Sequence, residues 1–100
     1  MNEINTKKIP VVAPCIHLNG TSAESLSNAM EAAYSALYKA RDLLRQCAPN
    51  GRDYYIGDVH LTQAEGQHRR RQLAIDAVMN SLETEMDLIN QRQQAELVTP

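Results

Sequence analysis

The chain of 100 residues contains no phenylalanine and no tryptophan, and its aromatic side chains are four tyrosines. This absence excludes a core built on large aromatic rings, so alanine, leucine and methionine, which favour helices, must carry the apolar load. The two cysteines are isolated, which excludes a CxxC motif and a disulfide framework. We interpret Cys15 and Cys47 as small buried hydrophobic residues.

Charge of neither sign dominates, because ten basic and twelve acidic residues leave a net charge of −2. A dedicated duplex-DNA binder usually carries a basic face, so nucleic acid is disfavoured as a partner, although a local basic pocket for a small anion is not excluded. No apolar run has the length of a membrane span or of a signal peptide. We therefore expect no membrane partner and a cytoplasmic location.

A first helix is predicted over about residues 22–48. Thr21 and Glu24 have the spacing of a capping box, which would satisfy backbone donors at the start of the helix. An apolar heptad seam follows, as expected of a helix that packs along a partner. The members of this seam are Leu26, Met30, Ala33, Leu37, Ala40, Leu44 and Cys47. Pro49, Asn50 and Gly51 are helix breakers and end the helix.

A second helix is predicted over about residues 62–94, where Thr62 and Glu65 form another capping box. Gly66 weakens the helical prediction for its first two turns. Its apolar stripe is helical in period. The stripe consists of Ile75, Val78, Met79, Leu82, Met86 and Ile89. Continued backward, it reaches Arg71 or Gln72 and then His68.

These patterns predict an all-α fold, a long antiparallel helical hairpin over residues 21–95. Residues 1–20 are expected to form an extended N-terminal arm and turn, with room for one edge strand near Pro10 and Pro14. Residues 96–100 are expected to be a frayed tail. Two helices cannot surround a core, and a spare stripe of Ala29, Ala36 and Leu43 needs a cover. The hairpin should therefore pack as a homo-oligomeric helical bundle, with a dimer as the minimal form.

No motif of a known catalytic site is present, neither a nucleophile elbow, a glycine-rich phosphate loop nor an HExxH sequence. The three histidines lack cysteine or carboxylate partners at the spacing of metal ligands. We therefore predict a non-enzymatic protein without catalytic residues, metal or cofactor.

The connector carries the most suggestive segment, in which Arg52 precedes Tyr54 and Tyr55. An arginine can direct two donors onto a phosphate, and a tyrosine ring can stack on a base. The alternative is a simple loop, in which Asn50-Gly51 makes the turn, the tyrosines cover the end of the bundle and Arg52 pairs with Asp53.

Two further segments are candidates for ligand contacts. His68, Arg69 and Arg71 open the second helix near the connector, although a run of arginines is commonly just a solvated face. His17 and Asn19 precede the first helix, whose exposed backbone donors attract anions. The alternative interpretation of the segment that contains His17 and Asn19 is a strand, a turn and an N-cap. In an antiparallel dimer this turn of one subunit would approach the connector of the other, which gives two composite sites.

Two blocks, Ile16-His17-Leu18-Asn19-Gly20-Thr21-Ser22 and Pro49-Asn50-Gly51-Arg52-Asp53-Tyr54-Tyr55, resemble a group of small phage and prophage proteins over roughly residues 15–90. The architecture is also similar to the helical-hairpin sponge proteins of phages, the anti-CBASS and anti-Thoeris proteins. That resemblance implies binding of a cyclic nucleotide or ADP-ribose-derived immune signal at subunit interfaces, without cleavage. Many members of that group have Pro-Gln-Gly after the double tyrosine, whereas this chain has Ile56-Gly57-Asp58, so the resemblance does not define this loop.

The sequence therefore predicts an anti-defence protein of phage type that sequesters a nucleotide-derived second messenger in the cytoplasm of an infected bacterium. Its expected partners are a small nucleotide-type ligand and other copies of itself. The expected ligand-binding residues are Arg52, Tyr54, Tyr55, His68, Arg69, Arg71, His17 and Asn19. Two alternatives stay open: a protein–protein inhibitor or accessory factor that acts through helix faces, and a nucleic-acid accessory factor that uses His68–Arg71.

Overall fold

The computed structural model describes residues 8–16, 20–54 and 58–98. It contains helix α1 (Ala23–Leu44), a short 3-10 helix η1 (Arg45–Cys47) and helix α2 (Asp58–Val98). The all-helical prediction is confirmed for these residues, and residues 8–16, where an edge strand was considered, form neither helix nor strand. Within the described chain, no helix has an apolar stretch sufficient to cross a membrane.

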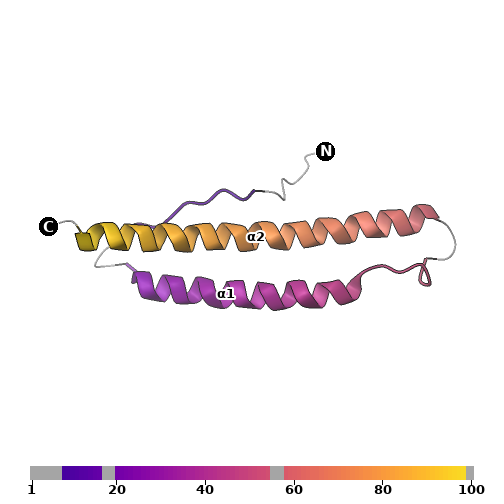
Figure 1. The fold of residues 1–100 in the computed structure, drawn as a ribbon, viewed down its shortest axis with the longest axis horizontal. Coiled ribbons are helices and arrows are strands. Elements are labelled where there is room, and N and C mark those ends of the chain that lie inside the picture. The colour runs from indigo at the N-terminus through magenta and orange to yellow at the C-terminus, as the bar shows by residue number, and fades with distance from the viewer. Residues whose placement is uncertain (1–7, 17–19, 55–57, 99–100) are drawn as a thin grey trace.

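Helix α2 is the central element of the molecule. Figure 1 shows α1 alongside it, with the chain running in opposite directions along the two helices, and residues 8–16 (the arm) on its other side. Arg92 fastens the arm, because its Nη1 donates to the carbonyl of Pro14 at 2.7 Å and to that of Ala13 at 3.4 Å. The fully buried side chains, Met79 and Ile89, belong to α2. The small core therefore follows this helix.

Helix α1 begins one residue later than predicted. Ser22 is its N-cap, and the Ser22 hydroxyl accepts from the backbone N–H of Ser25 at 3.1 Å. The prediction of a Thr21–Glu24 capping box is therefore wrong. A cap at Ser22 places Ser25, not Glu24, three residues into the helix.

The predicted seam of α1 is correct at four of its seven positions. Leu26, Met30, Leu37 and Leu44 are half-buried, whereas Ala33, Ala40 and Cys47 are exposed. Two half-buried residues take part in their place, Tyr34 and Arg41. The long side chains of these two residues cover apolar surface, while their polar ends stay in contact with water.

The two cysteines are both exposed, so the prediction that they are buried is wrong. Cys47 lies at the end of η1, where the chain leaves the side of α2. Cys15 lies on the arm, which has neighbours on one side.

Helix α2 is longer than predicted at both ends, because it begins at Asp58 rather than Thr62 and continues to Val98. The Thr62–Glu65 pair therefore lies inside the helix and does not cap it. Leu61 and Ala64 are half-buried on the line that leads to the buried His68. This alignment extends the packed side of the helix by about two turns from His68 toward the connector.

Gly66 lies inside α2 without interrupting it, and a Cβ atom placed there would meet nothing within 4 Å. We expect Gly66→Ala to raise the free energy of unfolding by about 1 kcal/mol, because alanine loses less backbone entropy in a helix. For a domain of this size the gain corresponds to about 4–8 °C in Tm, measurable by circular dichroism. An unchanged or lower Tm would contradict a continuous helix at this position.

The molecule is long and thin, with extents of 69 × 28 × 21 Å and a radius of gyration of 19.1 Å. A compact chain of this length has a radius of gyration of about 13 Å. Its accessible surface is 8101 Å², against about 5,700 Å² expected for a compact monomer of this mass. A single chain therefore leaves much of its surface uncovered.

Candidate functional site

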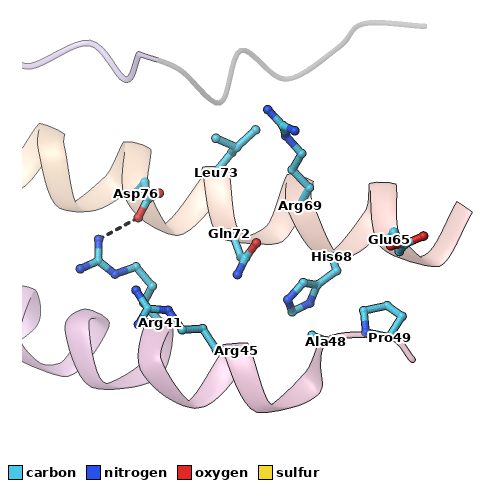
Figure 2. A pocket seen from close by; sticks show the side chains of 10 residues that line it. All are labelled: Arg41, Arg45, Ala48, Pro49, Glu65, His68, Arg69, Gln72, Leu73 and Asp76. Atoms are coloured by element: carbon cyan, nitrogen blue, oxygen red, sulfur yellow. Dashed lines mark hydrogen bonds and ion pairs between the residues drawn. The ribbon is translucent and has the colours of Figure 1, made fainter. Parts of the chain in front are cut away.

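A hollow of about 590 Å³ lies between α1 and α2, near the end of α1 from which the connector departs (Figure 2). Basic, acidic, amide and apolar side chains from both helices line it. We call it the central hollow, and its residues are Arg41, Arg45, Ala48, Pro49, Glu65, His68, Arg69, Gln72, Leu73 and Asp76.

Arg41 is the cation that the protein holds most firmly in the central hollow. Its Nη1 donates to Asp76 Oδ1 at 2.9 Å and so links α1 to α2 (Figure 2). Its guanidinium carbon also lies 5.0 Å from the centroid of the Tyr38 ring, within the range of a cation–π contact. The hydrogen bond to Asp76 raises the pKa of Arg41. Its positive charge is therefore permanent and fixed in place.

Arg45 and Arg69 provide two further cations with weaker local restraint. Arg45 follows Arg41 by four residues, and this spacing places both on the same side of the α1–η1 helix. Its contact with Asp42 is 3.5 Å long and exposed to solvent. Arg69 has no ion pair or hydrogen bond within the described residues, and Figure 2 shows its guanidinium at the rim, turned away from α1.

His68 is the buried polar residue of the central hollow. Its ring points from α2 toward Ala48 and Pro49, and 9% of its surface is exposed (Figure 2). Nε2 has no hydrogen-bond partner among the residues that the structure describes. A buried nitrogen without a partner costs about 1–3 kcal/mol. Buried polar groups of this kind are commonly satisfied by ordered water or an ion.

The remaining polar groups of the central hollow are Glu65 and Gln72, both on α2. A carboxylate accepts hydrogen bonds from hydroxyl or amino groups, and an amide both donates and accepts them. Three arginines and two carboxylates give the lining a formal charge of +1, whereas the whole chain carries −2. The arrangement therefore suits an anionic ligand that also carries hydroxyl or amino donors.

The structure brings two of the predicted ligand-binding residues into the central hollow, His68 and Arg69. Arg52 and Arg71 are exposed and do not line it. The backward extension of the apolar stripe of α2 reaches the hollow through Gln72 rather than Arg71. Predictions for His17, Asn19 and Tyr55 lie outside the described residues.

Tyr54 lines a separate hollow of about 520 Å³, where its arginine neighbour is Arg70 rather than Arg71. The other residues of this second hollow are His60, Gln63, Ala64 and Gln67. At 100° per residue Gln63, Gln67 and Arg70 lie 100° or more around α2 from His68, whereas Ala64 borders the packed side of the helix. Tyr54 and His68 therefore do not share a cavity in a single chain.

The connector turn is organised by Asn50. Its Oδ1 accepts from the backbone N–H groups of Arg52 at 3.0 Å and Asp53 at 3.3 Å, and its Nδ2 donates to Asp53 Oδ2 at 3.0 Å. The Asn50-Gly51 turn of the loop interpretation is therefore present. Its Arg52–Asp53 pair is not, because the Asp53 carboxylate bonds to Asn50 and leaves the exposed Arg52 side chain unpaired among the described residues.

Sequence reasoning missed Arg41 and Arg45, the two cations that α1 and η1 contribute. Their spacing of four residues was visible, but it has many uses on a helix surface. A stronger indication of the site is the pairing of Arg41 with Asp76. These residues are 35 positions apart in the sequence, so the pairing can be recognised only once the two helices are aligned.

Within the described residues, no three His, Cys, Asp or Glu side chains are grouped so that they could hold a metal ion. Comparison of the chain with protein-family models, with curated proteins and with solved structures gave no match.

Proposed function

We propose that this chain is a non-catalytic binding protein that holds a phosphate-bearing, nucleotide-type ligand in the central hollow. The observation that carries the proposal is the buried Nε2 of His68, which has no hydrogen-bond partner among the described residues and lines the same hollow as Arg41 and Arg45. Arginine forks donate paired hydrogen bonds to phosphate oxygens. Glu65 would accept from a ribose hydroxyl or a base amino group, and Pro49 would contact the ring of the base.

The biological role that we propose is sequestration of a nucleotide-derived immune second messenger, a cyclic oligonucleotide or a cyclic ADP-ribose isomer. The support is the resemblance of the His17–Ser22 and Pro49–Tyr55 blocks to phage proteins, together with the size and helical architecture of the chain. In this role the protein would act in the cytoplasm of an infected bacterium and release its ligand chemically unchanged.

We also propose that the functional form is a homo-oligomer in which the helical hairpins pack into a bundle. The support is the elongated shape and the large accessible surface of the single chain. Packing between copies would supply the cover that two helices and an arm cannot provide for themselves.

Ligand binding is tested with the purified full chain and a panel of inorganic phosphate, AMP, a cyclic dinucleotide, a cyclic trinucleotide and cyclic ADP-ribose isomers. A ligand at 100 times its Kd stabilises the folded state by about 2.7 kcal/mol, so a binder will raise Tm by several degrees. Mass spectrometry after release should recover that ligand intact. Absence of a shift with every member of the panel would contradict the proposal. If a host protein co-purifies with the chain in stoichiometric amount and no small ligand is found, the alternative function as a protein–protein inhibitor would be supported.

A further inference from the structure

One side of α1 is apolar and uncovered. Its members are small or aliphatic, uncharged and exposed, and we call them the outer face: Ala29, Ala32, Ala33, Ala36, Ala40 and Leu43. At 100° per residue they occupy a sector about 100° wide, next to the side that contacts α2. Elsewhere on α1 the exposed positions include charged residues such as Glu31, Lys39 and Asp42.

The outer face combines residues of two stripes for which the sequence pattern predicts different contacts. Ala33 and Ala40 were expected to contact α2, whereas Ala29, Ala36 and Leu43 were expected to face another copy. All five are exposed on the same side, and Leu43 is 50% exposed. One continuous surface, about 21 Å long at 1.5 Å per residue, is therefore available to a partner helix.

Four members of the outer face form two pairs about Ala36, and the remaining member, Ala33, has Lys39 as its counterpart. Ala29 and Leu43 each lie seven residues from it, and Ala32 and Ala40 each lie four residues from it. A two-fold axis through Ala36 therefore places Leu43 of one copy opposite Ala29 of an antiparallel second copy, and Ala32 opposite Ala40. A large side chain then meets a small one at both ends, as an isologous interface requires.

The amount of uncovered surface is also large enough for a contact with a second copy. The chain exposes 8101 Å², about 2,400 Å² more than a compact monomer of this mass. A standard interface buries about 1,200–2,000 Å² in total, which is about 600–1,000 Å² from each partner. The excess surface of one chain is therefore more than one dimer contact requires.

We propose that the outer face is the contact with a second copy of this chain, in which the two α1 helices pack antiparallel with the two-fold axis at Ala36. This inference rests on the homo-oligomer proposed above and specifies its surface, direction and register. Arg41 and Arg45 lie away from the outer face around the helix, so the dimer leaves the central hollow open.

Disulfide trapping tests the proposed axis in a full chain that carries C15S and C47S. Axes of helices packed through small residues lie about 8–10 Å apart, and Cα atoms lie about 2.3 Å from each axis. Two Cα atoms that face each other across the two-fold axis are therefore about 3.4–5.4 Å apart, and separations above about 4.4 Å in this range allow a disulfide between the A36C residues of the two copies. Its neighbour Ser35, exposed and 100° away, supplies the control S35C. We expect A36C to cross-link at least tenfold faster than S35C, with a dimer mass for the unsubstituted chain by light scattering.

Equal cross-linking rates of A36C and S35C would contradict the proposed register of the two α1 helices and the assignment of the outer face as their contact. If light scattering nevertheless gives a dimer or larger assembly, the homo-oligomer survives and only the outer-face inference falls. A monomer at all concentrations overturns both, and the ligand panel still tests the central hollow independently.

Discussion

Ile89→Ala is expected to lower the free energy of unfolding by about 2–5 kcal/mol, the range for removing a large aliphatic side chain from a packed core. Ile89 has 0% exposure, and Met79 is the other large side chain that is fully buried among the described residues. Domains of this length have a total stability of about 5–15 kcal/mol. A single truncation therefore removes a large part of it, and the loss is measured by urea denaturation at fixed protein concentration.

Val78 supplies the matched control for this prediction. It lies on the same helix but is 38% exposed, so Val78→Ala should change stability by less than about 1 kcal/mol. Where Ile89→Ala does not fold, Ile89→Val should still cost about 0.5–1.5 kcal/mol. Equal losses at positions 78 and 89 would show that the core does not follow the line of Met79 and Ile89.

Arg45→Gln is expected to weaken binding of the ligand identified in the panel by about 10- to 150-fold. Hydrogen bonds to charged groups contribute about 1.5–3 kcal/mol, and each 1.4 kcal/mol is a factor of ten in Kd. Arg45 is the cation of choice because it lines the central hollow and has only a 3.5 Å solvent-exposed contact with Asp42 to lose. Isothermal titration calorimetry gives the change in Kd, and Tm without ligand reports folding.

Arg52 offers a control of the same chemistry for the binding site. It is exposed on the connector and does not line the central hollow. Arg52→Gln should leave Kd within about twofold of the unsubstituted chain, because rim and surface positions contribute little. The reverse pattern, a large loss for Arg52→Gln and none for Arg45→Gln, would move the site to the connector where sequence reasoning first placed it.

Helical periodicity predicted the two rods well and the face of α1 less well. Alanine recurs so often in α1 that seams one residue apart are almost equally apolar, and Ala33 and Ala40 therefore looked like core positions. In the fold, Tyr34 and Arg41 are half-buried instead, and the long side chain of Arg41 reaches Asp76 on α2. Single-residue shifts of this kind depend on side-chain length, which a pattern of apolar positions does not contain.

The candidate site was predictable only where it lies on α2. His68 was found because it continues the apolar stripe, and its burial agrees with that reasoning. Arg41 and Arg45 depend on the relative alignment of two helices, which no local motif encodes. The turn at Asn50 orders its own backbone and leaves Arg52 in solvent, so the arginine of the richest sequence motif in the connector lies outside the central hollow.

The attachment of the arm has a consequence for how this protein can vary. Arg92 grips the carbonyl oxygens of Ala13 and Pro14, atoms that every amino acid possesses. Substitution of residue 13 or 14 therefore leaves the acceptors of these hydrogen bonds in place, whereas substitution of Arg92 removes their donor. Substitutions could therefore change the surface of the arm, and the molecules that this surface contacts, while the Arg92 guanidinium still holds the arm against α2.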